Sequence, residues 1–154
     1  MARGEIMTRL IEAPDGTGRY IETSKQLAAL EQIHAAIWHC RNEAFECAIT
    51  LAAAAEGLLP VTSEPHLFQV LANSPVARNN FDYNSMINWL KHPIAPEDNA
   101  IPEFEVAIIV VRAISKFNAI YRVGSPVMRD FVRWAFEQGH IPLPEGHETL
   151  RGIP

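Results

Sequence analysis

The first half of the chain contains a long stretch without proline or internal glycine. Its apolar residues recur at alternating steps of three and four and form one stripe, made of Leu30, Ile33, Ile37, Cys40, Ala44, Cys47, Leu51, Ala54 and Leu58. This spacing predicts an amphipathic helix. Ser24 is a good N-cap residue and Gly57 is a stop signal, so we predict one helix over 24–57. A kink near residues 39–42 is the alternative.

Caps, prolines and apolar periodicity predict four further helices. They cover residues 63–72, a segment from 79–82 to 92, residues 103–121, and a segment that starts at Ser125-Pro126 and ends at Gly139. The helix over 103–121 is almost entirely apolar apart from a narrow stripe of Glu105, Arg112 and Lys116, which predicts a buried central helix. Because its β-branched run at 106–111 also favours a strand, a strand is the alternative there.

The predicted fold class is all-α, an up-and-down bundle of about five helices with a long N-terminal helix. The domain organisation is an N-terminal arm over residues 1–22, with a short strand or turn around 19–21, a helical bundle over 23–140 and a C-terminal tail over 141–154. The apolar stripe covers more of the long helix than one small neighbour can hide. We therefore expect a homodimer.

Composition narrows the class of protein. The chain has 154 residues, a net charge of −5, 48 % apolar and 20 % charged residues, which is typical of a single globular domain. The negative charge gives no general attraction to nucleic acid or to a membrane surface. The longest apolar run, 106–111, is far shorter than the roughly 20 residues of a membrane span, and no signal peptide is evident, so we expect a cytoplasmic protein.

Both cysteines, Cys40 and Cys47, fall on the apolar stripe of the long helix. At a rise of about 1.5 Å per residue they are too far apart to form a disulfide with each other. We therefore expect reduced thiols in the core.

Glu56 is the most promising candidate for chemistry, because it follows a run of four alanines. Alanines let a neighbouring helix approach closely, so the carboxylate is expected to be partly desolvated and to need a hydrogen-bond donor. The candidate donors, and with Glu56 the candidate ligand-binding residues, are Asn88, Lys91, His92 and Arg41. The alternative is that Glu56 forms a structural ion pair or is exposed near the helix end.

Motifs for metal and cofactor chemistry have little support. Glu31 and His34 match half of a di-iron bundle site, but the second Glu-x-x-His pair is absent from the predicted helices. The sequence also lacks the motifs of zinc ribbons, zincins, P-loop enzymes and common hydrolases. We expect no catalytic residues, no metal and no cofactor.

Two strings, at residues 48–59 and 88–92, resemble uncharacterised bacterial proteins with a HEPN-like helical bundle. The resemblance implies an up-and-down bundle that is often dimeric and that binds nucleotides or cleaves RNA. Active members use an arginine and a histidine a few residues apart. The one such spacing in this chain, Arg133 to His140, is expected by chance, so the resemblance implies a member without the ribonuclease site.

The leading functional hypothesis is a non-enzymatic, dimeric interaction module that binds a protein partner. The alternative is a HEPN-like nucleotide-binding or RNA-acting protein. In that case Glu56, Asn88, Lys91 and His92 line a cleft between the first and third predicted helices.

Overall fold

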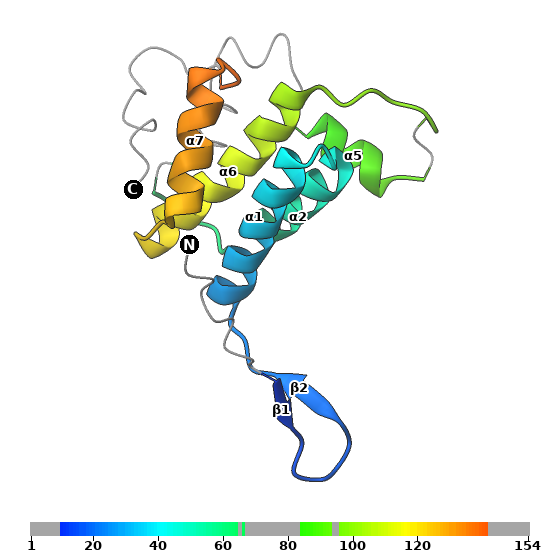
Figure 1. The fold of residues 1–154 in the computed structure, drawn as a ribbon, viewed down its shortest axis with the longest axis vertical. Coiled ribbons are helices and arrows are strands. Elements are labelled where there is room, and N and C mark those ends of the chain that lie inside the picture. Colours follow the sequence, from blue (N-terminus) through cyan, green and yellow to red (C-terminus); the bar gives the residue numbers. More distant parts are fainter. Residues whose placement is uncertain (1–9, 65, 67–83, 94–95, 142–154) are drawn as a thin grey trace.

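The computed structural model describes residues 10–64, 66, 84–93 and 96–141 (Figure 1). These residues form the elements β1 Leu10–Glu12, β2 Arg19–Ile21, α1 Lys25–Arg41, α2 Phe45–Leu58, α5 Ser85–Lys91, α6 Glu103–Tyr121 and α7 Pro126–Glu137. The predicted all-α fold is confirmed, since helices dominate and the described residues contain only one small two-stranded sheet. The predicted helix over 63–72 lies, apart from residues 63, 64 and 66, outside the described residues.

The prediction of one long N-terminal helix is wrong, because the chain reverses direction between α1 and α2. Glu43 adopts the left-handed conformation with φ of 61°. Its N–H donates to the Cys40 carbonyl at 3.2 Å, and the Ala44 N–H donates to the His39 carbonyl at 2.9 Å. These two bonds form a Schellman motif, the common way to end a helix. Glycine usually occupies the left-handed position of this motif. Because a glutamate occupies it here, the sequence contains no stop signal at the end of α1.

The reversal folds α2 back beside α1 and changes which residues are buried (Figure 1). In α2 the buried positions are Ala48, Ile49, Ala52 and Ala55 rather than the predicted stripe. Cys47 is exposed, so the prediction of two core thiols holds only for Cys40, whose burial raises the pKa of its thiol to about 11. Much of the apolar stripe is covered within one chain, which removes the original reason to expect a homodimer.

The central helix is α6, with the predicted bounds, and the strand alternative at 106–111 is wrong. It packs against α1, α2 and α7, and every residue from 106 to 115 is buried (Figure 1). Alanines at the contacts, among them Ala52 and Ala107, are fully buried and let the helix axes approach closely. No helix in the described part of the chain has the length and apolar character needed to cross a membrane.

The start and end of α7 follow the predicted signals. The Ser125 hydroxyl caps the helix by accepting from the Met128 N–H at 3.2 Å, and Pro126 fills the first turn. Gly139, with φ of 71°, supports a second Schellman turn, in which the His140 N–H donates to the Ala135 carbonyl.

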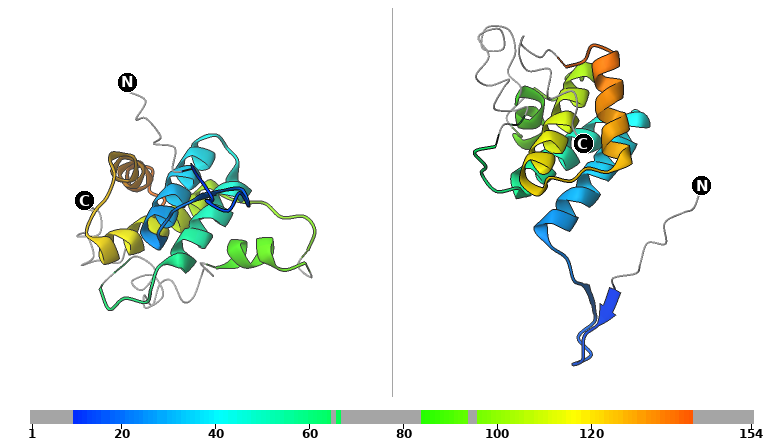
Figure 2. Two further views of the ribbon diagram at one scale, coloured as in Figure 1. Left: turned by 90° about the horizontal axis from the view of Figure 1, so that it is seen from below. Right: turned by 90° about the vertical axis from the view of Figure 1, so that its left-hand side faces the viewer.

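Strands β1 and β2 form an antiparallel hairpin that stands away from the helices (Figures 1 and 2). The strand predicted around 19–21 is present as β2. The hairpin pairs Leu10 with Ile21, Ile11 with Tyr20 and Glu12 with Arg19, and all six residues are exposed. It therefore carries apolar side chains on both faces without covering them.

Replacing Glu43 with glycine tests the turn between α1 and α2. A side chain in the left-handed conformation is strained, so Glu43→Gly is expected to raise the free energy of unfolding by about 1 kcal/mol. Urea unfolding followed by circular dichroism measures this change. The matched control is Glu46→Gly within α2, which is expected to lower stability by a similar amount. Destabilisation by both substitutions would contradict the assigned turn.

Candidate functional site

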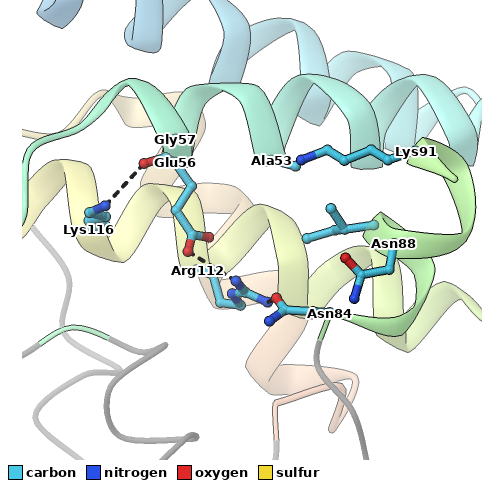
Figure 3. Close-up of a pocket in the computed structure, with 9 residues that line it drawn as sticks. Ala53, Glu56, Gly57, Asn84, Asn88, Lys91, Arg112 and Lys116 are labelled. Carbon is cyan, nitrogen blue, oxygen red and sulfur yellow. Dashed lines mark hydrogen bonds and ion pairs between the residues drawn. The ribbon is translucent and has the colours of Figure 1, made fainter.

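A pocket of about 310 Å³ opens between α2, α5 and α6 (Figure 3). Its lining is mostly polar and consists of Ala53, Glu56, Gly57, Asn84, Ile87, Asn88, Lys91, Arg112 and Lys116. The volume is at the lower end of the range for small-molecule sites. Three segments far apart in the sequence therefore contribute to one polar concavity.

The base of the pocket is an ion pair between Arg112 of α6 and Glu56 of α2. The Arg112 Nη2 lies 3.0 Å from the Glu56 Oε1, and the side chains are only 3 % and 14 % exposed. The Nη1 of the same guanidinium donates to the Asn84 Oδ1 at 3.2 Å. Because a buried charge must be paired and hydrogen-bonded, these contacts hold α2 and the start of α5 in place over α6.

Lys116, one helical turn beyond Arg112, ties α6 to the end of α2. Its Nζ donates to the backbone carbonyls of Glu56 and Leu59, both at 3.1 Å. The last carbonyls of a helix lack partners within the helix and carry partial negative charge, so a cation there is stabilising. An ammonium group has three donors, and contacts with the described residues use two of them, which leaves one for a ligand or for water.

Other polar groups at the pocket could contact a ligand. The Glu56 Oε2 accepts no hydrogen bond within the described part of the chain, and because it is buried the side chain would have to turn to present it to a ligand. Lys91 reaches from α5 toward Ala53 of α2, and the Asn88 amide lies on the α5 side of the pocket (Figure 3). A bound molecule could donate to Glu56 and accept from Lys91 and Asn88.

The charge of the pocket is opposite to that of the whole protein. Three cationic side chains and one carboxylate line it, so its formal charge is +2, whereas the chain carries −5.

His66 is 5 % exposed and interacts electrostatically with the charged groups of the pocket. Burial lowers the pKa of His66, Lys116 and Arg112 lower it further, and Glu56 opposes them. A neutral His66 leaves the excess of positive charge to the lysines and the arginine.

The structure brings together three of the five candidate residues found from the sequence. Glu56, Asn88 and Lys91 all line the pocket. His92 is the C-cap residue that follows α5, and it is not in the lining. Arg41 is not in the lining either, and its guanidinium lies 5.8 Å from the centre of the Phe131 ring in α7.

Sequence analysis missed the donor that Glu56 uses, which is Arg112, and also missed Lys116 and Asn84. A signal was present, since two cations four residues apart interrupt an otherwise apolar helix. A charge in a buried helix predicts a buried partner, but the partner comes from a helix 56 residues away in sequence.

The remaining catalytic and metal motifs do not assemble a site in the described residues. Arg133 is exposed and lies 3.5 Å from Asp130, whereas His140 packs on the Trp134 ring. His34 Nε2 lies 2.7 Å from the Ser125 hydroxyl rather than beside carboxylates. Among residues 10–64, 66, 84–93 and 96–141, no group of three or more potential ligands could hold a metal ion.

Comparison with protein-family models, with curated proteins and with solved structures found no match to the chain.

Removing Arg112 tests whether the ion pair supports the pocket. Arg112→Met leaves the mostly buried Glu56 carboxylate without its partner, so we expect a loss of about 3 kcal/mol in the free energy of unfolding. The double variant Arg112→Met, Glu56→Leu lacks the unpaired carboxylate as well, so it is expected to recover part of the lost free energy of unfolding. Urea unfolding of the two variants measures both effects.

The matched control is Arg133→Met, which breaks the exposed pair with Asp130 and is expected to change stability by no more than about 0.5 kcal/mol. Equal stability of Arg112→Met and the double variant would show that Glu56 does not depend on Arg112.

Proposed function

We propose that this protein is a helical-bundle binding protein that holds a small anionic molecule in the pocket between α2, α5 and α6. The observation that carries the proposal is the pocket's formal charge of +2 in a chain of charge −5. Such a local reversal of charge attracts anions and excludes cations. The buried guanidinium of Arg112, on α6, contributes one of the positive charges of the pocket and pairs with Glu56.

The polar groups of the pocket define the class of ligand more closely. Lys91 and the third donor of Lys116 suit a phosphate or a carboxylate. The buried Glu56 Oε2 needs a donor, such as a hydroxyl or amino group of the same molecule. Small phosphate esters with hydroxyl groups meet both conditions, and nucleoside monophosphates are among them. This agrees with the nucleotide-binding alternative that the resemblance to HEPN-like proteins implies.

Titration calorimetry with adenosine monophosphate, inorganic phosphate and adenosine tests this proposal. We expect adenosine monophosphate to bind more tightly than phosphate and adenosine not to bind, with affinity falling as salt is added. Lys91→Ala is expected to weaken binding of adenosine monophosphate about 10-fold, since a charged hydrogen bond contributes about 1.5 kcal/mol.

The matched control is Lys25→Ala, which removes an exposed lysine outside the pocket and is expected to leave binding unchanged. Absence of heat with every probe at millimolar concentration would refute the proposal, as would equal losses in the two lysine variants.

We also propose that the protein is a homodimeric interaction module. The support is the hairpin, in which Leu10, Ile11, Tyr20 and Ile21 are each between 37 % and 52 % exposed. An isolated two-stranded hairpin is at best marginally stable in water. Apolar residues on both of its faces favour a partner that covers them.

Light scattering coupled to size-exclusion chromatography at micromolar concentration tests the dimer. The expected mass is twice the 17.2 kDa of one chain. A mass of one chain at every concentration would rule out the dimer without affecting the ligand proposal.

A further inference from the structure

A second exposed surface lies where α7 runs beside α1. His34 Nε2 lies 2.7 Å from the Ser125 hydroxyl, and further along both helices the Arg41 guanidinium lies 5.8 Å from the Phe131 ring centre. The two helices therefore run in the same direction. His34, Trp38 and Arg41 share one stripe of α1, because they are spaced by four and three residues.

Apolar side chains are exposed along this contact. Trp38 is 61 % exposed, and Val127, which shares the stripe of Phe131 in α7, is 45 % exposed. Arg41 stacks over aromatic rings and forms no hydrogen bond or ion pair in the described part of the chain. We call Trp38, Arg41 and Val127 the receiving surface. It combines apolar area with a positive charge.

We propose that two copies of this chain exchange their hairpins, each hairpin docking on the receiving surface of the other copy. This inference rests on the homodimer proposed above and names the surfaces that form it. Two arguments support a second copy as the occupant: symmetry and charge.

Symmetry brings the two surfaces together. A two-fold axis perpendicular to α1 places the two α1 helices antiparallel, so that the N-terminal end of one lies beside the C-terminal end of the other. The hairpin extends beyond the N-terminal end of α1 (Figure 1), and Trp38 and Arg41 lie near its C-terminal end. The hairpin of one copy then meets the receiving surface of its partner, and the second contact follows by symmetry.

The charges of the two surfaces agree with this arrangement. Residues 10–22 carry Glu12, Asp15 and Glu22 against Arg19, so the hairpin segment has a formal charge of −2, complementary to Arg41. Reciprocal docking covers the face of each hairpin that carries Leu10 and Ile21, together with both receiving surfaces.

Substitutions on both surfaces of the full-length chain test the exchange by sedimentation velocity. Ile21→Ser in the hairpin and Trp38→Ser in the receiving surface are each expected to weaken dimerisation about 100-fold, since each change occurs twice in a symmetric dimer. The matched control is Val61→Ser, which changes a side chain that is 98 % exposed and belongs to neither surface. It is expected to leave the dimer intact.

Cross-linking identifies which surfaces meet. In a Cys47→Ser background, Ile21→Cys protein is mixed with Trp38→Cys protein and oxidised. A mixed disulfide in high yield is the expected result. A dimer that survives both substitutions, or that cross-links Ile21→Cys only to itself, would overturn hairpin exchange and leave the dimer standing. A wild-type monomer would overturn both the exchange and the dimer.

Discussion

A guanidinium inside the central, largely buried helix α6 has to be paired, and much of the arrangement around this helix follows from that requirement. Arg112 is 3 % exposed and finds Glu56 on α2 and Asn84 at the start of α5. An unpaired charge at this depth would cost several kcal/mol, so packings that separate these helices are disfavoured. The pair therefore sets the position of two helices relative to the core.

The same pairing produces the pocket. The guanidinium binds one oxygen of Glu56, and the other oxygen is buried and accepts no hydrogen bond from the described residues. Lys116 donates to two carbonyls at the end of α2. Positive charge is thereby concentrated where helices from three parts of the chain meet. A structural ion pair and a ligand-binding role were alternative interpretations of Glu56. In the structure the ion pair forms part of the wall of the pocket.

The helical bundle and the hairpin differ in how much of their apolar surface they bury. The helices share one core, whereas the hairpin stands apart with its apolar side chains exposed (Figure 2). Local strand pairing supplies few contacts, so a hairpin of this size needs a partner to gain stability. This is why we place binding of a ligand in the bundle and contact with a second copy at the hairpin.

The sequence by itself determined the helical class, the bounds of α6 and both ends of α7. These features depend on signals within a few residues, such as the caps Ser24 and Ser125 and the glycine at 139. It also identified Glu56 as a desolvated carboxylate, because a run of alanines beside it is a local feature.

Only the tertiary structure decided where the chain reverses and what Glu56 binds. Glu43 and Gly139 occupy the same position of the same turn, yet only the glycine is visible as a stop signal. The left-handed conformation of Glu43 costs free energy, and the packing of α2 on α1 and α6 offsets that cost. Such packing is a property of the whole fold and not of the local sequence. Arg112 likewise meets Glu56 only after distant helices have assembled, so no local pattern could identify the pair.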